Sequence, residues 1–274
     1  MKHKGYDDQG RDIWVVHQSW LKDFLLCPER ARQKMLGLVD DPGSDATAIG
    51  TAVHHHIEQR LLGIGTDHPT YATAYEMFDS LMATPNGPTW KQIKTAPTAH
   101  VRISNCIEAF ERHVLPTIGD VQAVEWPFRI LVHETDSYTL SIGGTVDCIA
   151  DGAVFDWKTG KQYWKDRGKP FEPYDTNEHQ RWAIQPTVYL PAVRTEFDVD
   201  EFIFVVLNKE AVTEPQFVPV TRSDEHAAWM VQQIESIVPT VQANLPVWGK
   251  NDQHYLCSEM WCPSWAGCKG KAMG

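Results

Sequence analysis

Two aspartates and one lysine stand at a spacing that could support hydrolytic chemistry. Asp147 lies in one β-favouring run, and Asp156 and Lys158 lie in the next. The Asp151-Gly152 pair between these runs predicts a tight hairpin turn. Because side chains alternate along a strand, Asp156 and Lys158 should point to the same face. The hairpin is therefore expected to gather two carboxylates and one amine on one surface.

Such a surface suits metal-assisted cleavage of phosphodiesters. Carboxylate oxygens bind hard divalent cations such as Mg²⁺. A bound cation lowers the pKa of a water ligand and stabilises charge on the phosphate, and the lysine could orient that water or help to deprotonate it. The alternative is a surface hairpin with an ordinary Asp156–Lys158 ion pair. The D-x-K pattern alone does not separate the two.

The composition is that of a soluble globular protein. The 274 residues are 42% hydrophobic and 22% charged, which fits a packed core. No apolar run approaches the ~20 residues of a membrane span, and the first residues lack the apolar centre of a secretory signal, so a cytoplasmic location is expected. The net charge of −11 argues against passive coating of nucleic acid. Basic residues still cluster locally, at Lys158, Lys161, Lys165, Arg167 and Lys169.

Hydrophobic periodicity predicts an α/β core with added helices. A loose start with a short strand over 13–16 is expected first. The expected helices begin at Ser19, at Pro28 and near Ala48, and continue over 70–82, 100–114, 177–193 and 223–244. The expected strands begin at Val121, with a first pair turning at 135–137, then the hairpin, then runs over 197–210 and 216–222, the last at a sheet edge because of Pro219. This order gives one integrated domain with a helical region over 1–120, a core over 121–244 and a tail over 245–274.

Three adjacent histidines lie on the helix expected from Ala48. His54, His55 and His56 point about 100° apart on a helix, so they cannot share one role. Glu58 lies four residues after His54 and on the same face. A structural or solvent-facing role is the alternative for each histidine.

Six cysteines are present, and three of them crowd the tail as Cys257, Cys262 and Cys268. In a reducing compartment, metal binding explains such crowding better than disulfides do. Three thiols need a fourth to complete the Cys₄ set that both Zn²⁺ and [4Fe–4S] clusters use. Free buried thiols are the alternative. We interpret Cys106 and Cys148 as core residues.

Several short motifs occur in a fixed order over most of the chain. They are a helical entry Ser19-Trp20-Leu21 with Cys27-Pro28, then Gly50-Thr51-Ala52-Val53-His54, Gly144-Thr145-Val146-Asp147, Asp156-Trp157-Lys158-Thr159-Gly160, and Gln185-x3-Tyr189 before the cysteine tail. This arrangement resembles the RecB-like exonuclease branch of the PD-(D/E)xK nuclease superfamily. That branch includes CRISPR-associated RecB-like exonucleases and phage recombination exonucleases.

The resemblance implies a fold and a set of roles. The fold would be a restriction-endonuclease-like core, a mixed central sheet flanked by helices, with N-terminal helical additions and a C-terminal cysteine tail. The implied ligands of Mg²⁺ or Mn²⁺ are His54, Asp147, Asp156 and the backbone carbonyl of Trp157, and the imidazole favours Mn²⁺. Lys158 would position the water, while Gln185 and Tyr189 would hold the lysine or contact DNA. Glu125 and Glu58 are further candidate acids.

The resemblance also implies a partner for the tail cysteines. Related families pair one cysteine before the histidine helix with three at the end, here Cys27 with Cys257, Cys262 and Cys268. The resemblance implies that these four cysteines hold a [4Fe–4S] cluster rather than Zn²⁺. The cluster would join the N-terminal helices to the tail. The four-residue gap between Cys257 and Cys262 differs from the two-residue gap common in the CRISPR-associated relatives.

The expected function is therefore a metal-dependent DNA exonuclease acting on ends or single strands in phage or bacterial recombination or repair. Recombination and replication proteins are further candidate partners, and no membrane is expected. Candidate DNA contacts are Lys161, Lys165 and Arg167, with base stacking by one or two of Trp157, Trp164, Trp182 and Trp261. The alternatives are a structure-selective endonuclease with the same site, a non-catalytic DNA-end binding or scaffold protein on a nuclease fold, and a zinc-stabilised interaction protein.

Overall fold

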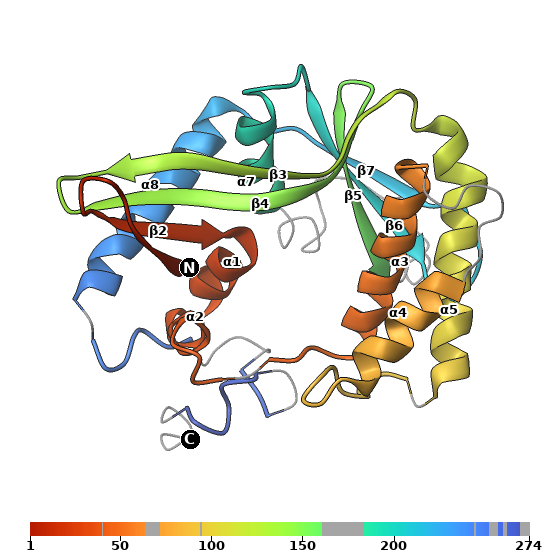
Figure 1. Cartoon of the computed structure of the whole chain (residues 1–274), viewed down its shortest axis with the longest axis horizontal. Coiled ribbons are helices and arrows are strands. Elements are labelled where there is room, and N and C mark those ends of the chain that lie inside the picture. The colour runs from red at the N-terminus through yellow and green to blue at the C-terminus, as the bar shows by residue number, and fades with distance from the viewer. Residues whose placement is uncertain are drawn as a thin grey trace.

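The computed structural model shows one mixed β-sheet with helices on both faces (Figure 1). The structure describes residues 1–39, 41–63, 72–93, 95–160, 184–243, 245–251, 257–259 and 262–268. The strands are β1 (Lys2–Tyr6), β2 (Asp12–His17), β3 (Val121–Glu134), β4 (Tyr138–Ala150), β5 (Ala153–Gly160), β6 (Glu201–Asn208) and β7 (Gln216–Val220). The helices are α1 (Gln18–Leu26), α2 (Pro28–Met35), α3 (Asp45–Leu61), α4 (Ala72–Ala83), α5 (Ala96–Ala109), α7 (Ile184–Val193) and α8 (Asp224–Gln242). The predicted α/β core flanked by helices is confirmed.

The sheet opens in its middle, at strand β4. Its order is β1-β2-β4-β5-β6-β7, and β3 pairs with the other edge of β4. On the shared edge, β2 pairs in parallel with β4 as far as Gly143, and β5 pairs antiparallel with it from Cys148 onward. Residues 144–147 have no strand partner on that edge within the described part of the chain. Beyond this window, β5, β6 and β7 turn away from β2, β3 and β4 (Figure 1).

The hairpin that joins β4 to β5 forms as the sequence predicted. Asp151 and Gly152 have φ of 44° and 74°, the left-handed values that a two-residue hairpin turn requires. Three residue pairs follow the turn, ending at Cys148 opposite Phe155. The local turn chemistry thus sets the register of the two strands that carry the aspartates.

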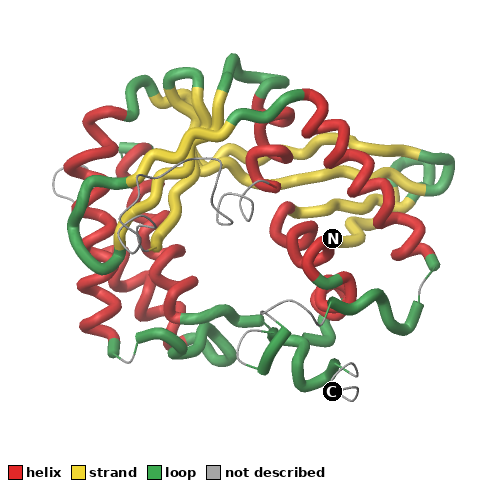
Figure 2. The backbone as a smooth tube through the Cα atoms, turned by 180° about the vertical axis from the view of Figure 1, so that it is seen from behind, coloured by secondary structure: helices red, strands yellow, loops and turns green. Residues whose placement is uncertain are grey.

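Two hydrophobic cores lie on opposite faces of β5 and β6. Phe202 and Phe204 enter the core built with α1, α7 and α8, whereas Val205 and Leu207 enter the core built with α3, α4 and α5. This division follows from the alternation of side chains along β6. Seen from behind, the two groups of helices lie at opposite ends of the molecule (Figure 2). In the described part of the chain no helix combines the length and apolar character needed to cross a membrane.

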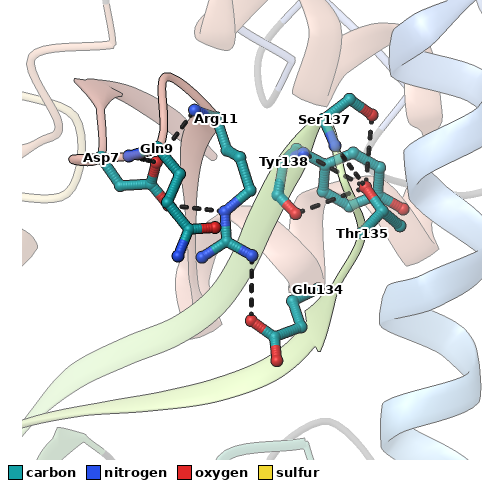
Figure 3. A network of polar contacts seen from close by, with 7 residues as sticks. All are labelled: Asp7, Gln9, Arg11, Glu134, Thr135, Ser137 and Tyr138. Carbon is teal, nitrogen blue, oxygen red and sulfur yellow. Dashed lines mark hydrogen bonds and ion pairs between the residues drawn. The ribbon is translucent and has the colours of Figure 1, made fainter.

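The N-terminal strands differ from the prediction of a loose start with one short strand. β1 and β2 form a hairpin, and β2 joins the sheet beside β4. Arg11 donates hydrogen bonds to Asp7 (2.7 Å) and to Glu134 (3.2 Å), and thus ties this hairpin to the turn between β3 and β4 (Figure 3). The pairing joins segments more than 120 residues apart, so no local sequence pattern marks it.

Three helices also begin earlier than predicted, among them α5, which begins at Ala96 rather than at residue 100. α3 begins at Asp45 rather than near Ala48, and α1 begins at Gln18 rather than Ser19. Asp45 is fully buried, and its carboxylate accepts hydrogen bonds from the backbone N–H groups of residues 91–93. The start of α3 is therefore set by a tertiary contact that periodicity does not reveal.

Three signals at element ends are confirmed. Pro28 is the first residue of α2, where its missing N–H is harmless. The helix expected from residue 223 is α8, which Ser223 caps in a capping box with His226. Pro219 lies in β7, which pairs only with β6 among the described strands.

Candidate active site

The opening of the sheet places Asp147 and Asp156 side by side. Cys148 and Phe155 form the last registered pair of the hairpin, and the two aspartates are the next residue on each strand. The backbone N–H of Trp157 donates a hydrogen bond to Asp147 Oδ2 at 2.9 Å. The two strands therefore stay close enough for the Asp147 side chain to bind the backbone of β5. Their facing edges are not paired with each other at the two carboxylates.

Helix α3 brings His54 to the same place. His54 Nε2 lies 2.8 Å from the carbonyl oxygen of Trp157, and its Nδ1 lies 3.4 Å from Asp147 Oδ2. Gly50, one turn earlier, faces β5, because a Cβ there would stand 3.4 Å from Thr159 Oγ1, an ordinary contact distance. The residues G-T-x-x-H thus place an imidazole beside the hairpin.

The other two histidines of the run face elsewhere, as their helical spacing required. His55 lies 3.7 Å from Glu58, and His56 is buried 3.4 Å from Glu111. Neither belongs to the group around Asp147. Glu58 is near that group, since its charge raises the pKa of Glu125.

Glu125 of β3 completes a group of three possible metal ligands. Single ligand atoms of His54, Glu125 and Asp147 all lie within 4.8 Å of one another, and this is the one such group in the described residues. Glu125 has φ of 47°, a left-handed conformation that is uncommon for a residue other than glycine. Strained backbone of this kind collects at functional sites. The sequence marked Glu125 as a candidate but could not reveal this conformation.

Asp156 and Lys158 share one face of β5, as their spacing predicted. Lys158 Nζ forms an ion pair with Asp156 Oδ2. Gln185 of α7 joins both residues, because its Oε1 accepts a hydrogen bond from Lys158 at 3.1 Å and its Nε2 donates to Asp156 Oδ1. The ammonium also lies 5.4 Å from the centre of the Phe204 ring. One amide therefore fixes the lysine and the carboxylate relative to each other.

Tyr189 lies one turn after Gln185 and is buried. Its ring packs edge-on against Phe128, with centroids 5.0 Å apart. A Cβ on Gly144 would stand 3.1 Å from the Tyr189 hydroxyl and 2.9 Å from Phe128. α7 therefore docks onto the unpaired window of β4 because residue 144 has no side chain. The motif around Gly144 does not by itself reveal this packing role.

The site concentrates negative charge in a buried place. Burial and the neighbouring carboxylate of Asp156 raise the pKa of Asp147 well above its usual value. Burial, with the charges of Glu58 and Asp156, raises the pKa of Glu125. Burial lowers the pKa of His54, which keeps its imidazole neutral and able to act as a ligand. Clustered carboxylates with a neutral imidazole fit a divalent cation of the Mg²⁺ or Mn²⁺ type.

Several predicted contacts lie elsewhere or outside the described residues. Trp157 is 2% exposed and packs between Phe110 and Phe155, so its ring cannot stack on a base. Only its backbone carbonyl faces His54. The remaining predicted contacts lie outside the described residues: Lys161, Lys165, Arg167, Trp164, Trp182 and Trp261.

The tail returns to helices α1 and α2, near Cys27. Trp248 packs on Phe24 with ring centroids 5.8 Å apart. The backbone N–H of Trp248 donates a hydrogen bond to the Glu29 carboxylate at 2.8 Å. Glu29 in turn donates its N–H to the carbonyl of Gly249 at 3.0 Å. These contacts hold the first described part of the tail against the break between the two helices.

Cys27 and Cys268 lie near enough to Cys262 to affect its pKa. Burial raises the pKa of Cys262, and the neighbouring thiols of Cys27 and Cys268 raise it further, whereas Arg30 lowers it. Among the described residues the cysteines do not come within 4.8 Å of one another as a group of three. A tetrahedral zinc site would require sulfur atoms about 3.8 Å apart, given Zn–S bonds of about 2.3 Å. Cys106 and Cys148 are fully buried in the core with α3 and α5, as predicted.

Comparison with known proteins identifies the family. A family model described as "PD-(D/E)XK nuclease superfamily" matches residues 17–269. The crystal structure of a "Putative exonuclease" from Eubacterium rectale aligns with a TM-score of 0.54 and 18% identity, over 89% of this chain and 86% of that one. The crystal structure of SSO0001 aligns with a TM-score of 0.42 and 14% identity, over 94% of this chain and 86% of that one. The search of curated proteins gave no match.

The first structural likeness supports the fold, and the family match spans nearly the whole chain, including every residue of the group around Asp147. The order of the motifs and their convergence at the opening of the sheet agree with that match. The chain belongs to the PD-(D/E)XK nuclease superfamily.

Proposed function

We propose that this protein is a metal-dependent deoxyribonuclease of the RecB-like branch, an exonuclease that hydrolyses phosphodiester bonds at DNA ends or in single strands. The observation that carries the proposal is the convergence of His54, Glu125 and Asp147 with the pair Asp156 and Lys158. The E. rectale structure carries the name "Putative exonuclease", which supports our choice of end-directed over internal cleavage. A structure-selective endonuclease would use the same residues.

The proposed cofactor is Mg²⁺ or Mn²⁺, held by the carboxylates of Asp147, Glu125 and Asp156, the imidazole of His54 and the carbonyl of Trp157. When bound, the cation makes a water ligand more acidic and stabilises charge on the phosphate. The ligand atoms within 4.8 Å of one another support His54, Glu125 and Asp147 as members of this set. The raised pKa values of Asp147 and Glu125 reflect buried, mutually repelling carboxylates, and a bound cation would relieve that repulsion.

The remaining residues have roles that do not require metal binding. Lys158 donates a hydrogen bond to the attacking water or to a phosphate oxygen, which positions the water, and its positive charge stabilises the transition state. Gln185 holds Lys158 and Asp156 at a fixed separation. Tyr189 is buried, so it positions Gln185 rather than touching DNA. Lys161, Lys165 and Arg167 are proposed to contact the DNA backbone.

The cysteines Cys27, Cys257, Cys262 and Cys268 are proposed to bind a [4Fe–4S] cluster, with structural Zn²⁺ as the alternative. The effect of the Cys27 and Cys268 thiols on the pKa of Cys262 supports a shared ligand. Metal analysis of the purified protein distinguishes the two, because a cluster gives iron and a broad absorbance near 400 nm and zinc gives neither. Recovery of neither metal would refute the assignment.

A cleavage assay tests the catalytic proposal. End-labelled single- and double-stranded DNA is incubated with Mg²⁺ or Mn²⁺ and the wild type, Asp156→Ala or Lys158→Ala. We expect the wild type to release mononucleotides or short products from an end and both variants to be inactive. Equal degradation by all three proteins would refute the assignment. Cleavage of circular DNA, which has no ends, would favour the endonuclease. The biological setting that we propose is recombination or repair in the cytoplasm of a bacterium or of a phage-infected host.

A further inference from the structure

Trp90 is a large aromatic side chain that the fold holds at the surface. It is 44% exposed, and it contacts Phe78 only through an edge, with ring centroids 5.9 Å apart. It lies in the connection between α4 and α5. Most tryptophans bury their rings because of the large apolar area, so an exposed ring in an ordered loop requires an explanation.

The loop around Trp90 is fixed on both sides. Before it, the carbonyl of Thr89 accepts the N–H of Asp45 at 3.0 Å, and the N–H of Thr89 donates to Gly43 at 3.4 Å. After it, the buried carboxylate of Asp45 accepts the N–H groups of residues 91–93, that of Lys91 at 3.1 Å. An exposed ring that is already ordered loses little conformational entropy when a ligand stacks on it.

The residues of α3 between this loop and His54 present small, polar side chains and no exposed acid of their own. Thr47 and Thr51 are exposed, and Gly50 is partly exposed between them. The one acid in residues 44–57 is Asp45, which is fully buried. In a chain with 36 acidic and 25 basic residues, a surface without carboxylates is where a phosphate backbone meets least repulsion. Lys91, exposed beside Trp90, adds a positive charge.

The spacing suits a nucleic-acid strand. Nine residues of helix separate Asp45 from His54, a rise of about 14 Å. A strand at helical spacing, about 3.4 Å per nucleotide, covers that length with about four nucleotides. We propose that Trp90 stacks on a base of the single-stranded substrate, about four nucleotides from the phosphate at His54, with the backbone lying along Thr47, Gly50 and Thr51. The stacking partner is any unpaired base, since every base offers a π-face. This inference rests on the proposed nuclease function and names a binding position for its substrate.

A binding experiment with a matched control tests the inference. Affinity is measured by fluorescence anisotropy for labelled oligothymidylates of two and twelve nucleotides, in EDTA, so that no cleavage occurs. The proteins are full-length wild type, Trp90→Ala, Trp90→Phe and Trp229→Ala. Trp229 is a suitable control because it is 48% exposed but lies on α8.

We expect Trp90→Ala to weaken binding of the twelve-nucleotide strand by about 5- to 100-fold. Trp90→Phe, which keeps an aromatic face, should retain most of the affinity, and Trp229→Ala should bind like the wild type. The two-nucleotide probe, too short to reach from His54 to Trp90, should bind all four proteins equally. In cleavage with Mn²⁺, Trp90→Ala should raise KM for the long strand and leave kcat unchanged.

The inference is overturned if Trp90→Ala binds the long strand like the wild type, if Trp229→Ala loses as much affinity, or if the short probe shows the same loss. The same is true if the wild type does not bind the long strand. A wild type that binds through Trp90 but does not cleave would refute the proposed nuclease function alone. Thermal melting of Trp90→Ala separates lost binding from lost folding, and Trp90→Phe decides the result if the alanine variant unfolds.

Discussion

The acid–histidine group and the cysteine region are built in opposite ways. The residues of the first, His54, Glu125, Asp147 and Asp156, all lie in helices or strands whose backbones are paired with their neighbours. In the second, Cys27 occupies the break between α1 and α2, and the other three cysteines lie in irregular segments of the tail. The sheet and α3 therefore position the first group without a ligand.

The difference predicts how each group of residues affects the stability of the fold. Gathering buried carboxylates costs folding free energy, as the raised pKa of Asp147 indicates. The irregular segments of the cysteine region have few regular contacts of their own, so a ligand shared by the thiols would stabilise the fold. Variants of the first group should lose function and keep stability, and variants of the second should lose stability.

The largest expected effect follows from Asp147→Asn. Cleavage should fall by about 10³-fold, because the variant removes a proposed metal ligand at the reacting phosphate. Thermal stability in EDTA should stay equal or rise, because the amide removes a buried charge beside Asp156. Glu108→Gln on α5 is the control for a carboxylate outside the group. An Asp147→Asn protein that keeps its activity and has a lowered Tm would contradict the expected contrast between the acid–histidine group and the cysteine region.

Cys262→Ser should show the opposite behaviour. Loss of one thiol should release the metal, and the Tm should fall by about 5 °C or more, because bound metal contributes directly to folding. Differential scanning calorimetry with metal analysis measures both. Cys106→Ala is the matched control, since that thiol is buried far from the tail and its loss should leave the metal content unchanged. Retention of full metal and Tm by Cys262→Ser would contradict a structural metal.

Gly144→Ala should lower both stability and activity. The new methyl group meets the Phe128 ring at 2.9 Å and the Tyr189 hydroxyl at 3.1 Å. Overpacking of this kind costs about 1–3 kcal/mol, and displaced Tyr189 would carry Gln185 away from Lys158. We expect kcat to fall by about 10- to 100-fold. The double variant Gly144→Ala with Phe128→Leu should recover part of the loss, and a double variant no better than the single one would argue against this packing.

The smallest effect concerns the contact between tail and helices. Hydrogen bonds from Arg32, Gln33 and the Trp248 backbone lower the pKa of Glu29 to about 2 against the opposing effect of burial, compared with 4.5 in an unfolded chain. A lowered folded-state pKa means that Glu29 stabilises the protein above pH 4.5 and that this contribution is lost as the pH falls toward 2. Urea unfolding at pH 5 and pH 3 should show a smaller acid-induced loss for Glu29→Gln than for the wild type. Equal losses would show that Glu29 does not link pH to stability.

The parts of the structure that the sequence predicted well are those with local causes. The Asp151-Gly152 turn, the helix start at Pro28 and the cap at Ser223 each depend on a few neighbouring residues. The shared face of Asp156 and Lys158 follows from strand geometry alone. The group of candidate site residues could be named because their motifs lie on such elements.

The parts that the sequence did not predict depend on distant contacts. β2 joins β4 across more than 120 residues, and α3 begins where Asp45 meets residues 91–93. The left-handed backbone of Glu125 lies between the residue pairs Val124–Cys148 and Trp126–Val146 of β3 and β4. The opening of the sheet at residues 144–147, which creates the site, is a property of three strands at once.

The most direct test is Mn²⁺ binding to the intact protein. Isothermal titration calorimetry with Mn²⁺ should give one tight site in the wild type and in Lys158→Ala, whose lysine is not a proposed ligand. The site should be lost in Asp147→Asn and weakened in Glu125→Gln, with the Tm in EDTA unchanged. Mn²⁺ binding to Asp147→Asn with wild-type affinity would contradict the claim that the opening of the sheet builds the metal site.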